Sequence, residues 1–378
     1  MPSANLQEIA VSEEAVSRRI DRIYDTLDRA YGFLFATGRK EGHWSEVRST
    51  ALAGMCIDYL PSGTTEWCHS IRGWLEEQQL KEGAAQGSWG EEIWDTAMAL
   101  IALKALGAHT NDPQLDSGLK WMASKYSVNG RGNWHDDPWE TSWALLAILK
   151  SGKMLPGVDV LAAIHWLSSL QDPEGRIIAP QFTAYFIEIC LSLAKVDIDL
   201  SDSLSEGVQN AKSFLLSALS NSSPSTLWTG EAWSNGQILW ILTELKIFPF
   251  QDLGLADKTI SWFQKKQDPI DGHWEDAEDT ASALLGLLGL LHGLTAIVDG
   301  ARQAREVVSS ELRRRIKLRS LEINSKVFSR DVEYGGILIR ISQEKIRIIG
   351  YLGSILALLA ALTGIWDFIT NHLIASKR

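Results

Sequence analysis

The chain has 378 residues, of which 45% are hydrophobic and 22% are charged, so it is long enough to bury the core of one large domain or two modest ones. Its three cysteines, Cys56, Cys68 and Cys190, lie far apart and form no C-x-x-C pair, which argues against a disulfide framework and favours a reducing compartment. The amino-terminal residues are polar and charged, so no secretory signal peptide is expected.

The net charge of −11 hides a difference between two parts of the chain. Residues 1–300 carry 22 basic against 40 acidic side chains, whereas residues 301–378 carry 14 basic against 7 acidic ones. This change predicts a boundary near residue 297. The acidic character of the larger part argues against nucleic acid as its partner.

Six segments of the first 300 residues share one plan. Each has an aromatic-aliphatic pair, often a glutamine four residues after the aliphatic member, then a G-x-W element, then an acidic-Thr-Ala step that opens an apolar run. The pairs are separated by 41, 47, 45, 48 and 48 residues, a period typical of repeated supersecondary units. In chain order they are Phe33-Leu34, Trp74-Leu75, Trp121-Met122, Trp166-Leu167, Phe214-Leu215 and Trp262-Phe263.

The G-x-W elements separate two kinds of predicted helix. Gly87-Ser88-Trp89 is one clear copy, the fourth copy degrades to Gly175-Arg176-Ile177, and the fifth keeps only Trp228. After each element comes an apolar run at helical spacing, such as TAMALIALKAL from Thr96. Each unit is therefore predicted to be an α-hairpin, and the more apolar helix of each is expected on the inside of a closed ring. These inner helices are expected to begin near Glu46, Glu92, Asp137, Pro180, Trp233 and Asp276.

The repeated pattern carries a resemblance to a known group of proteins. W-L-x3-Q-x(n)-G-x-W, seen in WLEEQQLKEGAAQGSW and WFQKKQDPIDGHW, resembles the QW repeat of squalene and oxidosqualene cyclases, in the terpenoid cyclase/protein prenyltransferase superfamily. The resemblance covers roughly residues 17–296. It implies an all-α fold, an (α/α)6 toroid of six helical hairpins in which Trp and Gln tie consecutive hairpins together. We place this toroid at residues 12–297.

The segment 276–281, DAEDTA, resembles the D-x-D-D motif of class II cyclases, whose middle Asp protonates an alkene or epoxide. The resemblance makes Glu278 the candidate proton donor, with Asp276 and Asp279 supporting it. Burial among apolar side chains would keep such a carboxyl group protonated, and exclusion of water would protect a cation. Tryptophan could add cation–π stabilisation. The candidate ligand-binding residues are Trp94, Trp139, Trp143 and Trp233.

A structural interpretation of the acidic segment competes with the catalytic one. Acidic side chains recur at the same positions of other repeats, because they accept the free N–H groups of a helix's first turn and suit its dipole. Only Glu278 is unshared, since other copies have Arg48, Trp94 and Trp139 there. The longer Glu side chain also displaces the acid, and a shift of about 1 Å can cost on the order of a hundredfold in rate. Moreover, the family's cyclases enclose substrate between two toroids, and this chain has length for one.

A metal site is not expected. A zinc-dependent prenyltransferase subunit needs Asp, Cys and His side chains that converge on the metal. The cysteines have no partnered His-Asp motif, and His135-Asp136-Asp137 indicates a loop and a helix cap. No phosphate-binding G-x-x-x-x-G-K-[ST] loop, H-E-x-x-H or G-x-S-x-G motif occurs, so we expect no cofactor.

Residues 298–344 are predicted to form a basic amphipathic helix and a connector. The helix spans 304–323, with Val308, Leu312, Ile316 and Ile323 near helical spacing, and could lie against anionic lipid headgroups. A short irregular or extended piece around 327–341 follows.

Residues 345–372 are predicted to contain a transmembrane helix. The run 348–366 has nineteen residues without a charge, about the length that crosses a bilayer. Lys345 and Arg347 precede it, which favours a tail-anchored, single-pass protein with its toroid in the cytoplasm. Small residues at 353, 357 and 361 would allow homo-oligomers through this helix. The alternative is a buried helix packed on the toroid.

The leading functional hypothesis is a membrane-anchored toroid that binds or senses an isoprenoid, another lipid or a partner peptide, or acts as an effector, without catalysis. The alternative is a class II-type terpene cyclase that protonates a polyprenyl substrate through Glu278. A third possibility is a scaffold whose cavity is filled by its own side chains.

Overall fold

The computed structural model describes residues 3–38, 42–44, 46–58, 65–127, 132–194, 198, 200–223, 225–299, 308, 310–312, 315, 333–334 and 337–338, with the backbone alone for residues 3–13, 58, 65, 194, 298–299, 333–334 and 337–338. The chain divides into two compact units, Met1–Arg314 and Arg315–Arg378, which are described separately. In the second unit, strands β3 (Glu333–Tyr334) and β4 (Ile337–Leu338) pair antiparallel.

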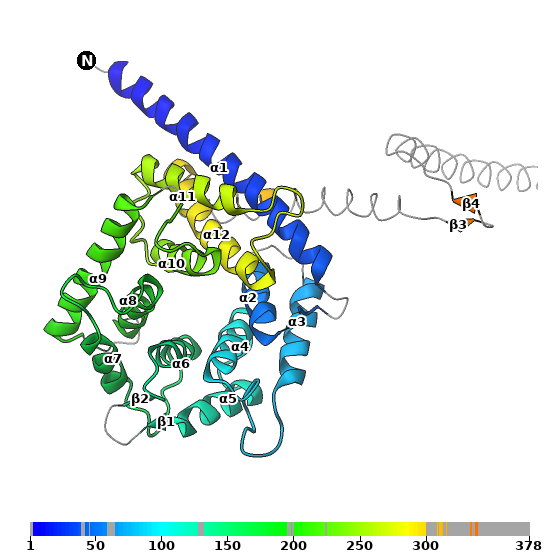
Figure 1. Ribbon diagram of the computed structural model, residues 1–378, viewed down its shortest axis with the longest axis vertical. Helices are drawn as coiled ribbons and strands as arrows, with labels where there is room; N and C mark the ends of the chain where they lie inside the picture. Colours follow the sequence, from blue (N-terminus) through cyan, green and yellow to red (C-terminus); the bar gives the residue numbers. More distant parts are fainter. Residues whose placement is uncertain are drawn as a thin grey trace, which may run out of the picture. The chain divides into compact units, whose positions relative to one another are not determined.

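The helices of the first unit alternate between an inner and an outer layer (Figure 1). Around the inner layer, α2 contacts α4, each later inner helix contacts the next, and α12 returns to α2, so the ring is closed. The outer helices are α1 (Ser3–Thr37), α3 (Thr65–Gln78), α5 (Pro113–Ser124), α7 (Val160–Ser169), α9 (Asp202–Asn221) and α11 (Leu253–Lys266). The inner helices are α2 (Val47–Asp58), α4 (Ile93–Ala105), α6 (Pro138–Ser151), α8 (Pro180–Ala194), α10 (Ala232–Glu244) and α12 (Ala277–Asp299).

This arrangement confirms the predicted fold class, a ring of six helical hairpins that is called the toroid below. Each inner helix begins within one residue of its expected start. The inner helices are apolar because both of their faces are covered: α4, for example, is buried without interruption from Thr96 to Leu103. The short strands β1 (Tyr126–Ser127) and β2 (Asn133–Trp134), which the sequence did not predict, pair antiparallel in the third hairpin.

One buried polar side chain per inner helix fixes the loop that precedes it. In every repeat the backbone N–H of the loop's Trp, or of Ile177 in the fourth repeat, donates to a Thr hydroxyl or to the Asn235 side-chain oxygen. The bond therefore persists where the G-x-W pattern has degraded. The pairs and their N···O distances are Trp44–Thr50 (3.0 Å), Trp89–Thr96 (3.0 Å), Trp134–Thr141 (3.1 Å), Ile177–Thr183 (2.9 Å), Trp228–Asn235 (3.1 Å) and Trp274–Thr280 (3.0 Å).

The loop indoles bind the outer helix of their own hairpin. Each of four Nε1–H groups donates to the backbone carbonyl of the second member of the aromatic-aliphatic pair, so the loop Trp is held at the same place beside that pair in each of these copies. The four bonds are Trp89–Leu75 (2.6 Å), Trp134–Met122 (2.8 Å), Trp228–Leu215 (2.9 Å) and Trp274–Phe263 (2.9 Å).

Three of the six junctions between consecutive hairpins are linked by a glutamine. The side-chain amide of Gln79 donates to Gly87 in its own loop (2.9 Å) and to Gln114 at the start of the following outer helix (2.8 Å). Gln171 makes the same two contacts with Gly175 and Gly207.

The third glutamine closes the ring. Gln267 donates to Gly272 of its own loop (2.8 Å) and to Thr26 of α1 (3.0 Å). Asp257 of α11 strengthens this junction through ion pairs with Arg19 and Arg22 of α1.

Glycines bring α10 and α12 into backbone contact. A Cβ atom at Gly236 would lie 2.3 Å from the Ser282 carbonyl oxygen, and one at Gly286 would lie 2.6 Å from the Gly236 oxygen. Real Cβ atoms do not approach other atoms so closely. These two inner helices therefore pack at a distance that only glycine permits.

Among the residues that the structure describes, one helix is long and apolar enough to cross a membrane. It is 277–297 of α12, with mean hydropathy 1.7, and 72% of that window is buried inside the protein. Because α12 belongs to the inner ring, this is weak evidence for a membrane span. The predicted span at 345–372 lies outside the described residues. Val308 and Leu312 of the predicted amphipathic helix are fully buried, so these two side chains are not available to a lipid surface.

Candidate functional site

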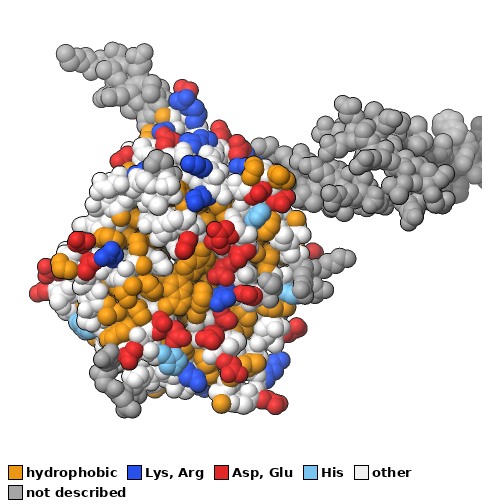
Figure 2. Space-filling view, viewed as in Figure 1, with side chains coloured by type: hydrophobic (Ala, Val, Ile, Leu, Met, Phe, Trp, Pro, Cys, Tyr) orange, Lys and Arg blue, Asp and Glu red, His pale blue; other side chains and the backbone are white. Residues whose placement is uncertain are grey.

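The predicted site residues gather where the inner helices begin. The second residue of each inner helix lies two positions before the buried Thr or Asn. These six residues are called the mouth row: Arg48, Trp94, Trp139, Gln181, Trp233 and Glu278. Six helix N-termini place their positive dipole ends around this row, which favours carboxylates there. The face shown in Figure 2 has hydrophobic side chains at its centre, with Asp and Glu side chains gathered around them.

The indoles of the mouth row meet across the ring. The Trp139 ring lies 4.9 Å from Trp94 and 5.0 Å from Trp233, and the Trp94 and Trp233 rings are 6.2 Å apart, measured between centroids. Since α4 and α10 stand opposite each other in the ring, their indoles bridge its central axis. Edge-to-face contacts of this kind add about 0.5–1.5 kcal/mol per pair beyond area burial.

Glu278 pairs with Arg48, which stacks on one indole of this cluster. Its Oε2 lies 3.5 Å from Arg48 Nε, and its side chain is 15% exposed. The same guanidinium binds Glu46 at 2.9 Å, lies 3.6 Å from Asp95 and stacks over the Trp94 ring at 4.3 Å. Burial raises the pKa of Glu278 to about 7; Arg48 opposes this rise, and neighbouring carboxylates, Asp276 first among them, add to it.

Asp276 and Asp279 bind backbone N–H groups at helix starts. Asp276 Oδ1 accepts the Asp279 N–H of its own helix at 2.9 Å, and Asp279 Oδ1 accepts the Trp233 N–H of α10 at 2.9 Å. Asp279 thereby links the start of α12 to the start of α10. Burial, and then the Asp276 charge, raise the pKa of Asp279 to about 7.

The fourth predicted tryptophan, Trp143, lies one turn deeper. It is 1% exposed, and its ring is 5.2 Å from Tyr185 and 6.3 Å from Trp139. The structure thus brings Glu278 and the mouth-row indoles together and places Trp143 beneath them. Sequence reasoning did not select Arg48, Tyr185 or Gln237. Arg48 occupies the same repeat position as Glu278, and that equivalence was the available signal.

Asp268, Asp271 and His273 form a group of possible metal ligands, with one ligand atom of each within 4.8 Å of the others. Their contacts are those of a surface turn, because Asp268 Oδ1 accepts the N–H groups of Ile270 and Asp271. The His273 ring stacks on Phe33 at 4.7 Å.

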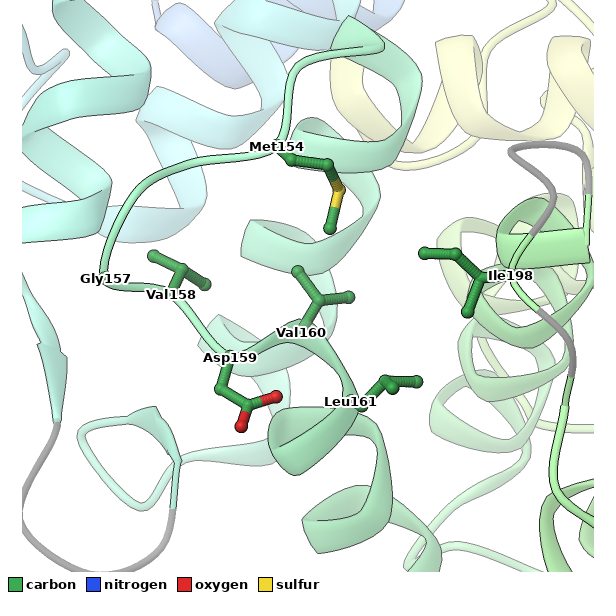
Figure 3. A pocket seen from close by; sticks show the side chains of 7 residues that line it. All are labelled: Met154, Gly157, Val158, Asp159, Val160, Leu161 and Ile198. Atoms are coloured by element: carbon green, nitrogen blue, oxygen red, sulfur yellow. The ribbon is translucent and has the colours of Figure 1, made fainter.

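A pocket of about 470 Å3 lies away from the mouth row (Figure 3). It is lined by Met154, residues 157–161 and Ile198, from the connection that follows α6, the start of α7 and the chain after α8. Because α6 begins at the mouth row and ends at this connection, the pocket is at the opposite end of the inner helix. It contains none of the predicted site residues.

No family model matches the chain, and no curated protein matches it. Solved structures do match. One variant of the type II terpene cyclase MstE from Scytonema, in its apo form, has a TM-score of 0.55 at 14% identity, covering 73% of this chain and 99% of that chain. Another variant, in complex with its substrate geranylgeranyl dihydroxybenzoate, has a TM-score of 0.54 at 13% identity, covering 74% of this chain and 99% of that one.

These matches correct one argument made from the sequence. We expected cyclases with this chemistry to need two toroids, but a chain named as a type II terpene cyclase is covered almost completely by about three quarters of this one. A single ring therefore does not exclude that chemistry. At 13–14% identity the likeness establishes architecture and not activity. The chain has the fold of a terpenoid cyclase.

Proposed function

We propose that the toroid is a non-catalytic module that binds an isoprenoid or a related lipid at the centre of its inner ring. The observation that carries this proposal is the contact of Trp94, Trp139 and Trp233 across the ring axis. These indoles form an aromatic surface on the axis of the inner ring. Aromatic side chains also pack well against an unsaturated apolar chain. A ligand that enters between the indoles would therefore replace their ring–ring contacts with contacts to itself.

The contacts of Glu278 and its neighbours also give them structural roles. Glu278 is paired with Arg48 at 3.5 Å, and with a pKa of about 7 it is only partly protonated at neutral pH. Asp276 and Asp279 already accept hydrogen bonds from backbone N–H groups, so both have a structural role that does not depend on a reaction.

Ligand binding is testable through the intrinsic fluorescence of the indole cluster. Geranylgeraniol added to the purified protein should change tryptophan emission in a saturable way. Trp139→Ala should weaken this binding, whereas Glu278→Gln should retain it. Product analysis of the same samples should return the ligand unchanged. An absence of saturable binding in the parent protein would favour the scaffold hypothesis instead.

We further propose that residues 345–372 anchor the protein in a membrane with the toroid on the cytoplasmic side. The charge-free run 348–366 and the basic residues before it support this proposal. Full-length protein should float with liposomes, and protein lacking residues 345–378 should not. Association that survives the deletion contradicts the anchor. Homo-oligomers through this helix would appear as crosslinked dimers that the same deletion abolishes.

A class II-type cyclase is the second candidate, because a solved type II terpene cyclase has a chain that this toroid covers almost completely. In that case Glu278 would donate the proton and Arg48, 3.5 Å away, would stabilise the carboxylate left behind. A cyclised product that forms from a polyprenyl substrate and disappears in Glu278→Gln would establish this function over the binding proposal.

A further inference from the structure

A second row of side chains lies one turn below the mouth row and is mostly polar. At the position two residues after the buried Thr or Asn, four neighbouring inner helices carry Trp143, Tyr185, Gln237 and Ser282, called the polar row. None of the four is more than 1% exposed. The other two helices carry Leu52 and Met98 there, so the polar side chains occupy one side of the ring.

The polar row is continuous from α6 to α12. The Trp143 and Tyr185 rings are 5.2 Å apart, and the Tyr185 hydroxyl donates to Gln237 Oε1. Gly236, next to Gln237, meets the backbone of Ser282, so those two side chains start from helices in direct contact.

Three polar atoms of this row have no hydrogen-bond partner within the described part of the chain: Trp143 Nε1, Gln237 Nε2 and Ser282 Oγ. Since the Gln237 oxygen is turned to Tyr185, its amide N–H groups must be satisfied elsewhere. One turn deeper, Trp240 Nε1 and Glu188 Oε2 are buried and unpartnered as well. Buried donors without acceptors are rare in proteins, because each loses its hydration without compensation. Three unpartnered polar atoms in one row indicate a site whose hydrogen bonds are completed by a ligand.

The unpartnered atoms define the chemistry of the missing group. Indole and amide N–H groups only donate, and a hydroxyl can donate, so the complementary group is an oxygen acceptor. It is a neutral one, because the donors carry no charge, and Lys150 and Arg48 are already paired, with Glu188 at 2.6 Å and with Glu278 at 3.5 Å. A phosphate or carboxylate ligand would therefore find no unpaired positive charge on these two side chains.

We propose that the polar row binds the neutral oxygen of a ligand that is otherwise apolar, of the prenyl alcohol or prenylated quinone class. This inference rests on the proposed binding function and specifies its ligand: an oxygenated isoprenoid is preferred over a hydrocarbon such as squalene. The oxygen enters past the mouth-row indoles and accepts from Trp143, Gln237 and Ser282. An oxygenated interior also suits a carbocation poorly, because nearby hydroxyl and carboxylate oxygens would trap it.

The test compares geranylgeraniol and squalene as ligands of the purified protein and of two matched serine variants. Ser282→Ala removes an unpartnered buried hydroxyl. Ser151→Ala removes a buried hydroxyl on α6 that already donates to Ile148 at 2.6 Å. Geranylgeraniol affinity should fall about fivefold to tenfold in Ser282→Ala, the loss of one neutral hydrogen bond. It should stay unchanged in Ser151→Ala, and squalene affinity should change in neither. Trp143→Phe, which removes only the indole donor, should repeat the Ser282→Ala result.

The stability of the ligand-free variants gives an independent readout. Ser282→Ala should keep or raise the melting temperature, because it removes an unsatisfied group, whereas Ser151→Ala should lower it. A fall in Ser282→Ala as large as in Ser151→Ala would mean that water already satisfies the hydroxyl and would overturn the inference. Equal binding of alcohol and hydrocarbon, unaffected by the variants, would overturn the inference and leave the binding function standing. Binding of neither ligand would overturn both.

Discussion

Replacement of Glu278 by Gln should flatten the dependence of the toroid's stability on pH. In the folded protein burial raises the pKa of Glu278 to about 7, from an ordinary value of 4.5. The folded state therefore binds the proton more tightly than the unfolded state. Its contribution favours folding at acidic pH and is lost as the pH rises through about 7.

The size of this effect follows from the same two values. Between pH 8 and pH 5.5, a group with these folded and unfolded pKa values adds at most about 2 kcal/mol to the free energy of unfolding. The side chain is 15% exposed, so solvent screening removes only part of this amount. Glu278→Gln keeps the shape of the side chain and removes its titration. The difference in stability between the two pH values should then shrink by up to about 2 kcal/mol.

Urea denaturation followed by circular dichroism at pH 5.5 and pH 8 measures this difference directly. Asp279→Asn serves as the companion variant. It should also reduce the difference, because burial raises the Asp279 pKa to about 7, while its amide oxygen can still accept the Trp233 N–H. A Glu278→Gln protein with the full pH dependence of the parent would refute the assignment of Glu278 as a buried carboxyl held above its ordinary pKa.

Two further variants test the packing that positions the site. Gly236→Ala should destabilise the toroid by about 1–3 kcal/mol, because the new Cβ would sit 2.3 Å from the Ser282 oxygen. The control Gly73→Ala should stabilise it by about 0.5–1 kcal/mol, since nothing lies within 4 Å of that position in helix α3. Equal melting temperatures of the two would contradict the close α10–α12 contact. Gln267→Leu should cost about 1–3 kcal/mol, because it removes the hydrogen bonds to the Gly272 and Thr26 carbonyls. Thermal unfolding that matches the parent would show that this link does not close the ring.

The ring could be predicted from the sequence because the residues that define its repeat period make equivalent hydrogen bonds in successive copies. The Trp of the loop donates to the outer helix, and the acidic-Thr-Ala step marks the start of the inner helix. Both signals are local, so a single sequence is enough to align the repeats with one another. The fourth and fifth repeats were harder, since Ile177–Thr183 and Trp228–Asn235 keep the bond but lose the pattern.

The site was predicted in part, because the repeat alignment names which residues share a position but not which of them touch. Glu278, Trp94 and Trp139 were aligned at one repeat position, yet the contact of Trp94 with Trp233 across the axis depends on how tightly the ring closes. Likewise, the pairing of Arg48 with Glu278 joins the first and last repeats. The polar row lies one helical turn deeper than the aligned positions. Its unpartnered atoms can be recognised only once the positions of the neighbouring side chains are known.

The most direct test of the whole account is to identify what the protein returns after incubation with geranylgeraniol under conditions where binding is saturated. Cyclisation leaves the mass unchanged, so extracts must be separated by gas chromatography before mass spectrometry. The account predicts that the bound alcohol is recovered unaltered, from the parent protein and from Glu278→Gln alike. A new cyclic isomer that accumulates with the parent and is absent with Glu278→Gln would contradict it.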